Sequence, residues 1–173
     1  RMNEILKIHS KITQALKEKK PIVALETTII THGLPYPQNL ETAWLLERAV
    51  EEEGAVPATI GVIDGVVHIG MERQELEKLA KHKAEKIQVH TLPLALVQKL
   101  WGGTTVSATL HLAQQVGIKV FATGGIGGVH REVELTGDIS TDLLTLANTP
   151  VAVVSAGAKA ILDLPKTLEM LET

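Results

Sequence analysis

The sequence contains no cysteine at all. Disulfide bonds, thiolate catalysis and zinc–thiolate sites are therefore excluded, and redox chemistry gives no information about the compartment. Aromatic residues are almost as scarce, at 2% of the chain, so the core must be built from alanine, valine, isoleucine and leucine. Such a composition does not provide the aromatic surface on which the bases of single-stranded nucleic acids stack.

An excess of positive charge is also lacking. The formal net charge is −3, and no basic run is longer than the patch at residues 17–20, which disfavours a nucleic-acid polymer as partner but is compatible with a small anionic ligand. No apolar run approaches the ~18 residues that a membrane span requires. The first twenty residues carry too many charges for a secretory signal. We therefore expect a cytoplasmic protein with no membrane partner.

The chain does contain enough apolar residues for a folded core. Hydrophobic residues make up 45% of its 173 residues, and short apolar runs alternate with segments of helical periodicity. We find no internal repeat, no low-complexity tract and no linker. These features predict one α/β domain over residues 1–173.

Periodicity and turn residues predict the individual elements. The expected helices cover residues 3–19, 40–53 with Asn39 as N-cap, 72–82, a segment ending at 100, 106–117, 141–147 and a last one beginning near Lys159. The expected strands cover residues 22–25, a hairpin within 58–70 that turns at Asp64–Gly65, a short strand within 85–93, residues 118–122 and a buried run after residue 150.

The stretch at residues 123–143 combines backbone freedom with titratable groups. Glycine lets the backbone approach a ligand closely and adopt a positive φ, so this stretch is the first candidate for chemistry. The alternative is a surface turn followed by a helix that Ser140 caps and Asp142 stabilises in its first turn. The residues in question are Gly124, Gly125, Gly127, Gly128, His130, Arg131, Asp138 and Asp142.

A second glycine-rich segment, residues 102–105, precedes a predicted helix. Free backbone N–H groups and threonine hydroxyls at a helix N-terminus are suited to binding phosphate. The alternative is an ordinary helix start capped by threonine.

Lys159 follows a turn of small residues beside a predicted buried strand. We expect partial desolvation there, which lowers the pKa of a lysine and makes its amine a nucleophile toward carbonyl carbon. The alternative is a lysine that extends from the first turn of a helix into solvent.

Several of these features follow the carboxyl end of a predicted strand. They are Glu26, residues 102–105, residues 123–130 and Lys159. Ligands of open α/β sheets bind along that edge, so we expect these segments to converge. Asp138 and Asp142 could hold Mg²⁺ or Mn²⁺ through few protein ligands and several waters. The glycines complete neither a dinucleotide fingerprint nor a Walker loop, and the chain has no GxSxG or HExxH motif.

Five blocks in the same order give the chain a family resemblance over nearly its whole length. It resembles the pseudouridine-5′-phosphate glycosidases, the indigoidine-synthase-A-like family. The blocks are PIVALETTIITHGLPYPQN, WGGTTVSATL, VFATGGIGGVHR, GDISTDL and VSAGAKAILDL. The sequence departs from the family at REVELTG, where a small residue is usual after VHR, and at Gly137, where an aromatic residue is usual.

The resemblance implies an enzyme that reversibly cleaves the C–C glycosidic bond of pseudouridine 5′-phosphate to uracil and ribose 5-phosphate. It further implies a homotrimer, one Mn²⁺ per subunit, and a three-layer α/β/α fold with a central, largely parallel or mixed sheet. Members of the family continue beyond the point that corresponds to Thr173, with a segment that contributes to the base pocket. We therefore expect the 173 residues to lack that segment.

The same resemblance implies roles for individual residues. Glu26 corresponds to the proton donor, Lys159 to the nucleophile and Asp138 to the metal-associated aspartate, which Asp142 could assist. Thr105 and His130 join the substrate-binding set through their places in the two glycine-rich segments. The expected substrate-binding residues are Lys86, Thr105, Val106, His130, Ser140, Thr141 and Asp142.

In the implied mechanism Lys159 attacks C1′ of the sugar while Glu26 protonates the ring oxygen. Uracil departs as a stabilised carbanion equivalent, and hydrolysis of the Schiff base releases ribose 5-phosphate. Two other hypotheses fit the same residues. One is a Schiff-base sugar-phosphate enzyme of aldolase type, and the other is a sugar-phosphate-binding fragment without activity.

Overall fold

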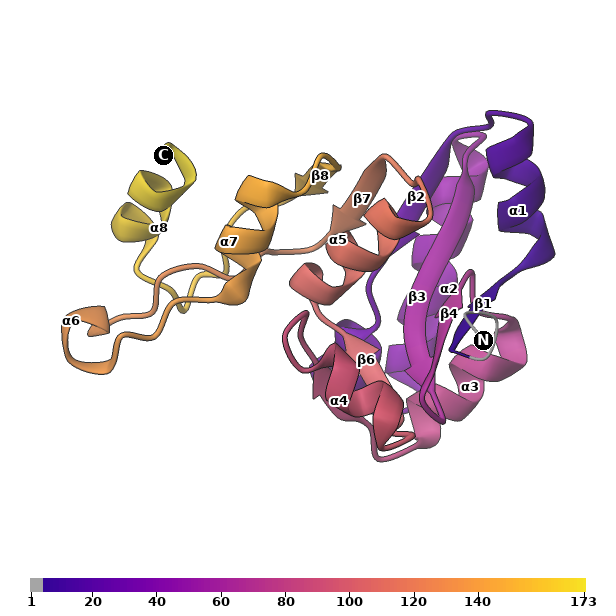
Figure 1. Ribbon diagram of the computed structural model, residues 1–173, viewed down its shortest axis with the longest axis horizontal. Helices are drawn as coiled ribbons and strands as arrows, with labels where there is room; N and C mark the ends of the chain where they lie inside the picture. Colours follow the sequence, from indigo (N-terminus) through magenta and orange to yellow (C-terminus); the bar gives the residue numbers. More distant parts are fainter. Residues whose placement is uncertain (1–4) are drawn as a thin grey trace.

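The computed structural model describes residues 5–173, and Figure 1 shows how their elements are arranged. The strands are β1 (Leu6–Ile8), β2 (Ile22–Leu25), β3 (Val56–Ile63), β4 (Val66–Ile69), β5 (Glu85–Ile87), β6 (Gly102–Thr104), β7 (Val120–Thr123) and β8 (Ala152–Ser155). The helices are α1 (Ser10–Lys17), the π-helix η2 (Ile29–Gly33), α2 (Gln38–Glu52), α3 (Arg73–Lys81), α4 (Leu92–Val97), α5 (Val106–Gln115), α6 (Val133–Thr136), α7 (Thr141–Asn148) and α8 (Leu164–Leu171).

The eight strands form one mixed sheet in the order β1-β4-β3-β2-β7-β8, with β6 pairing with β3 and β5. The β3–β4 and β3–β6 pairs are antiparallel and the other pairs are parallel. One buried cluster joins α1, α4 and α5 to the sheet, and a second joins α2, α3 and η2. Helices therefore cover both faces, which confirms the predicted three-layer α/β/α fold with a mixed central sheet.

The β3–β4 hairpin turns where the sequence predicted. Ile63 pairs with Val66, and the two residues between them, Asp64 and Gly65, have φ values of +50° and +72°. Positive φ at both positions is the requirement of a type I′ turn, which Asp-Gly satisfies.

Three predictions about helix starts are wrong, two of them within the first forty residues. Residues 6–8 form β1, which pairs in parallel with β4, so the first helix begins only at Ser10, and residues 3 and 4 lie outside the described residues. Leu6 and Ile8 alternate with Lys7, and this short period-two pattern was hidden in the helical periodicity. Asn39 does not cap α2, which begins at Gln38. Its side-chain amide instead donates to the carbonyl oxygens of Ile30 and Ala80, at 2.9 and 3.0 Å.

The segment predicted as a glycine-rich turn is a strand up to Thr104, and only Thr105 acts as the N-cap of α5. Gly103 lies so close to η2 that a Cβ atom there would be 2.1 Å from Thr31 Oγ1 and 2.9 Å from the Thr27 carbonyl oxygen. The glycines of β6 are thus explained by close packing within the protein.

We expect Gly103→Ala to lower the free energy of unfolding by about 1–3 kcal/mol, because the added methyl group must displace Thr31 and neighbouring backbone. Urea unfolding followed by circular dichroism measures this change. Gly124→Ala is the matched control, because nothing lies within 4 Å of a Cβ at that position, and it should change stability by less than about 0.5 kcal/mol. Equal stability of the two variants would contradict the assignment of Gly103 to a packing role.

The helix expected from Lys159 is also displaced, since α8 begins at Leu164 after the N-cap Asp163. Before it, Ala158 forms a bridge with Ile126, and the Lys159 N–H donates to the Ile126 carbonyl oxygen at 3.1 Å. A turn follows at residues 160 and 161. Pairing with the glycine-rich stretch therefore overrides the helical preference of the alanines in this segment.

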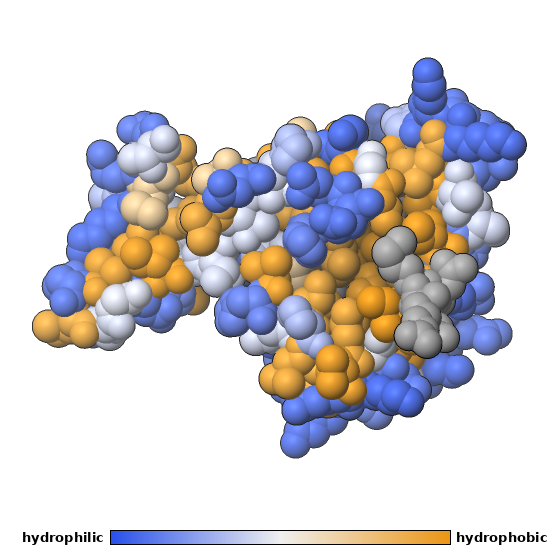
Figure 2. Space-filling model, in the orientation of Figure 1, coloured by the Kyte–Doolittle hydropathy of each residue, from blue (hydrophilic) through white to orange (hydrophobic). Residues whose placement is uncertain are grey.

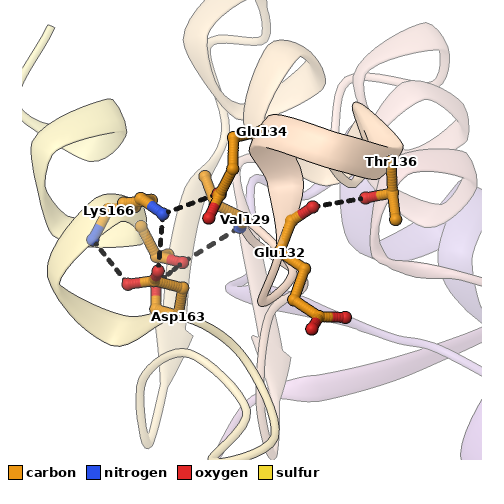
Figure 3. A network of polar contacts seen from close by, with 7 residues as sticks. Val129, Glu132, Glu134, Thr136, Asp163 and Lys166 are labelled. Atoms are coloured by element: carbon orange, nitrogen blue, oxygen red, sulfur yellow. Dashed lines mark hydrogen bonds and ion pairs between the residues drawn. The ribbon is translucent and has the colours of Figure 1, made fainter.

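In the segment that follows β7, coloured orange to yellow, α6 and α8 lie away from the sheet in Figure 1, whereas β8 pairs with β7. Figure 2 shows apolar side chains on its surface and a hollow between it and the rest of the molecule. Lys166 of α8 pairs with Glu134 of α6 and with Asp163, each at 3.1 Å (Figure 3). These pairs are solvent-exposed and contribute little to stability. The segment's largely exposed apolar residues include Leu135, Leu144, Val154, Ile161 and Leu168.

The helices of residues 5–173 include none that is long and apolar enough to cross a lipid bilayer.

Candidate active site

A cavity of about 420 Å³ lies along the edge of the sheet where β2 and β5 end. Its wall combines the starts of α5 and α7, the glycine-rich stretch and the segment after β8, so the predicted convergence of these segments is confirmed. All ten residues predicted from the sequence line it: Glu26, Lys86, Thr105, Val106, His130, Asp138, Ser140, Thr141, Asp142 and Lys159.

The ends of β2 and β6 meet beside β3, and this junction places Glu26 near Thr105. The Thr104 N–H donates to Thr27 Oγ1 at 2.9 Å, and both threonine hydroxyls donate to the Ile60 carbonyl oxygen at 2.8 Å. Thr27 and Thr104 are completely buried. Buried hydroxyls that are all satisfied fix their neighbours in one geometry, so the network holds this part of the site rigid.

Glu26 is largely withdrawn from solvent and accepts a hydrogen bond from Thr123 Oγ1 of β7. Burial raises the pKa of Glu26, while the Thr123 hydrogen bond and the charges of Lys159 and Lys86 oppose that shift in part. A glutamate with a raised pKa keeps its proton to higher pH than an ordinary one. Glu26 is therefore suited to act as a general acid.

Lys159 follows Ala158, which forms a bridge with Ile126, and the charge of Lys159 acts on Glu26. The lysine is exposed in the structure, so the partly desolvated position expected from the sequence is wrong. The small residues around it, Gly157, Ala158 and Ala160, leave its side chain uncovered.

Asp142 is buried and connects three segments through its carboxylate. Oδ1 accepts from the N–H of Ser107 in the first turn of α5 at 2.9 Å, and Oδ2 accepts from the N–H of Gly127 at 2.8 Å. A carboxylate at a helix N-terminus is stabilised by the positive end of the helix dipole. Ser140 caps α7 as predicted, because its Oγ accepts from the Asp142 N–H at 3.1 Å.

The role expected of the four glycines requires a correction. None of Gly124, Gly125, Gly127 and Gly128 has a positive φ. Gly127 and Gly128 are instead needed for close packing, because Cβ atoms there would lie 2.3 Å from Ser140 Oγ and 2.5 Å from Thr167 side-chain atoms. The loop therefore fits tightly against α7 and α8.

We expect Asp142→Asn to lower the free energy of unfolding by about 1–3 kcal/mol, because an amide places a donor against one of two buried N–H donors. Chemical denaturation measures the change. Asp138→Asn is the control, because the Asp138 side chain is 60% exposed and its substitution should leave stability unchanged. Full stability of Asp142→Asn would mean that these two hydrogen bonds do not hold the loop.

Among the described residues of the cavity, Asp138 and His130 are the pair that could serve as ligands of a metal ion. His130 Nδ1 lies 3.7 Å from Asp138 Oδ2, and the His130 N–H donates to the Asp138 carbonyl oxygen at 3.0 Å. Residues 5–173 contain no group of three or more histidine, aspartate or glutamate side chains able to hold a metal. A hard divalent ion here would take one or two protein ligands and complete its shell with water or phosphate, a mode that Mg²⁺-like ions use.

A second cavity of about 530 Å³ adjoins the first, and four residues line both: Glu26, Thr28, Lys86 and Lys159. We call the first cavity the polar chamber and the second, whose remaining wall includes Ile29, His32, Gly124 and residues 156–160, the small-residue chamber. Both residues with predicted catalytic roles thus stand at the boundary between the chambers.

Four polar residues of the two walls were not among the site residues predicted from the sequence. Thr28 and His32 belong to the η2 region, and Gln88 and His90 follow β5. Gln88 Oε1 accepts a hydrogen bond from Thr141 Oγ1 at 3.2 Å. Only their position just after β2 or β5 could have indicated them.

The sequence profile of the family described as "Indigoidine synthase A like protein" matches residues 11–173. A pseudouridine-5′-phosphate glycosidase from Caldanaerobacter subterraneus is 57% identical over 99% of this chain and 56% of its own length. One from Escherichia coli is 53% identical over 98% of this chain and 55% of its own length. The chain therefore spans about half the length of the curated relatives it matches.

Two crystal structures are similar over 97% of this chain and 55% of their own chains. The prealnumycin C-glycosynthase AlnA, in complex with ribulose 5-phosphate, superposes with a TM-score of 0.88 at 44% identity. An indigoidine synthase A-like protein from Thermotoga maritima superposes with a TM-score of 0.87 at 35% identity. Both support the three-layer fold described above.

Proposed function

Because the chain belongs to the indigoidine synthase A like family, we propose that it catalyses the reversible cleavage of pseudouridine 5′-phosphate to uracil and ribose 5-phosphate. The observation that carries this proposal is the position of Glu26 and Lys159 together at the boundary between the two chambers. The names of the curated relatives support a reaction at a glycosidic bond, and so does the similar C-glycosynthase, which was crystallised with ribulose 5-phosphate.

The proposed chemistry uses a lysine nucleophile because a C–C glycosidic bond has no leaving oxygen for an acid to protonate. The Lys159 amine forms a bond to C1′, and the bond from C1′ to the ring oxygen breaks as Glu26 protonates that oxygen. The lone pair of the lysine nitrogen then expels the uracil carbon, which takes up a proton, and an imine remains on Lys159. Water hydrolyses the imine to ribose 5-phosphate and the free amine.

The polar chamber is the proposed position of the sugar phosphate. The N-termini of α5 and α7 both face it, and Lys86, Lys159 and His130 add cationic or hydrogen-bonding side chains. Helix N-termini attract anions through the helix dipole and through N–H groups that are left free; in the first turn of α5 the N–H groups of Ser107 and Ala108 are already paired with Asp142 and Thr105. The other assigned contacts, Thr105, Val106, Ser140 and Thr141, line the same wall.

We further propose that one Mn²⁺ per subunit is held by Asp138, with His130 as the nearest additional donor. The small donor set fits an ion that also coordinates water and the substrate phosphate. When bound, such an ion neutralises negative charge on the phosphate. Assembly as a homotrimer and a cytoplasmic location are further proposals, which rest on the family resemblance.

The decisive experiment combines two measurements on the 173-residue chain. The first is uracil release from pseudouridine 5′-phosphate, followed by chromatography. The second is borohydride reduction in the presence of ribose 5-phosphate, followed by peptide mass analysis of Lys159. Uracil release together with a reduced adduct on Lys159 is the expected result.

Other results would select the remaining hypotheses. An adduct on Lys159 without uracil release favours the aldolase-type enzyme. Binding of ribose 5-phosphate with neither adduct nor release favours a binding fragment. That last outcome matters because the chain spans about half the length of its relatives.

A further inference from the structure

The boundary between the two chambers contains one residue without an assigned role. Of the four residues that line both chambers, Glu26, Lys86 and Lys159 are ionisable and have proposed functions. Thr28 is the fourth and the only neutral one. Its position puts it beside any substrate that extends from one chamber into the other.

The hydroxyl of Thr28 is buried and has no hydrogen-bond partner. Its neighbours differ in this respect, since Thr27 Oγ1 donates to the Ile60 carbonyl oxygen at 2.8 Å and Thr31 Oγ1 donates to the Thr27 carbonyl oxygen at 3.3 Å. Among residues 5–173, the other buried side-chain atoms without a partner belong to Trp44 and His68, and neither residue lines either chamber. A buried unpaired hydroxyl is unfavourable and requires an explanation.

We propose that Thr28 is a substrate-binding residue whose hydroxyl pairs with the hydroxyl on C2 of a pentose 5-phosphate. This inference rests on the proposed function for the placement of the sugar. With the phosphate in the polar chamber and the base in the small-residue chamber, C1 lies at the boundary. Lys159 is assigned to C1 and Glu26 to the ring oxygen, so the C2 hydroxyl is the polar group nearest to C1 that still needs a partner.

The side chain of Thr28 can reach the cavity by a change of rotamer. Threonine in helical backbone is divided between two χ1 rotamers, which place its hydroxyl at different staggered positions. The backbone of Thr28 is helical, with φ −59° and ψ −36°. Thr28 lines both chambers, so the proposal requires that rotation about χ1 turn its hydroxyl toward them, where a sugar hydroxyl supplies the missing partner.

The test compares ribose 5-phosphate with 2-deoxyribose 5-phosphate as probes. The readout is the rate at which borohydride traps the adduct on Lys159, expressed as the ratio of the two sugars. One neutral hydrogen bond corresponds to a preference of about tenfold for ribose. We expect a ratio near 10 for the unmodified chain and near 1 for Thr28→Val. For Thr28→Ser the ratio should lie between these values or equal that of the unmodified chain.

Thr31→Val is the matched control on η2, whose N-cap is Thr28, because Thr31 has partners and lines neither chamber. It should keep the ratio of the unmodified chain. A ratio unchanged in Thr28→Val, or a ratio near 1 in the unmodified chain, would overturn the proposal. Far-ultraviolet circular dichroism of each variant shows whether it has folded.

This test is separate from that of the proposed function. If the adduct forms but no uracil is released from pseudouridine 5′-phosphate, the proposed function fails and the ratio still decides the role of Thr28. If no adduct forms with either sugar, calorimetric dissociation constants of the two sugar phosphates replace the trapping rates. The same ratios are then expected, and the same deviations would overturn the proposal.

Discussion

Replacing Lys159 with arginine is expected to abolish the borohydride-trapped adduct and to slow uracil release by at least about 10⁴-fold. Arginine keeps a positive charge near Glu26, but its guanidinium group is not deprotonated in proteins and cannot form an imine with the sugar. The variant therefore removes the nucleophile while it preserves most of the local electrostatics. Mass analysis of reduced peptides and chromatographic detection of uracil measure the two effects.

Lys166→Arg is the matched control for this substitution. Lys166 is an exposed lysine that pairs with Glu134 and Asp163 and lies outside both chambers. Its replacement should leave the adduct on Lys159 and the rate of uracil release unchanged. A reduced adduct on another lysine in Lys159→Arg, with uracil still released, would contradict the assignment of the nucleophile.

Glu26→Gln is expected to retain binding of ribose 5-phosphate but to slow cleavage by about 10²–10⁴-fold, because glutamine cannot supply the proton for the ring oxygen. The pH dependence provides a second readout. Burial raises the pKa of Glu26, so the required protonated form predominates below this raised pKa and is lost as the pH rises through it. For the unmodified chain, kcat/KM should therefore fall on the alkaline side at a pH above the ordinary range of a glutamate.

Glu47→Gln separates this effect from a general effect of buried glutamates. The pKa of Glu47 is also raised by burial, and its Oε1 accepts a hydrogen bond from Thr59 Oγ1 at 2.6 Å, but it lines neither chamber. Its substitution should leave the alkaline limb of kcat/KM in place. Turnover by Glu26→Gln at a rate near that of the unmodified chain would remove Glu26 from the mechanism.

Much of the site could be predicted because strand ends are visible in the sequence. Short apolar runs locate β2, β7 and β8, and a parallel sheet brings their carboxyl ends to one edge. Glu26 follows β2 directly, and Lys159 comes four residues after Ser155, the last residue of β8. Their proximity is therefore a consequence of topology.

The other features of the site could not be predicted, because they depend on contacts between residues far apart in the sequence. Gly102 and Gly103 look like a turn, because glycines carry no side chain to show that both are paired in a strand. Gly102 lies close to Ile87 of β5, and Gly103 lies close to Thr31 of η2. Gln88 has no motif around it and reaches the site only because β5 adds to β6. The exposure of Lys159 follows from how the chain pairs with Ile126, which no local preference predicts.

The order of the strands also has a consequence for folding kinetics. Glu26 follows β2, whereas Lys159 follows β8, which is at the sheet edge and pairs only with β7. Contacts between residues so far apart in sequence form slowly, because the chain must first lose the entropy of a long loop. The acid and the amine therefore meet only after β8 has docked. In stopped-flow refolding, borohydride trapping at successive times would measure how much adduct forms on Lys159. The appearance of the adduct would report when the sheet is complete.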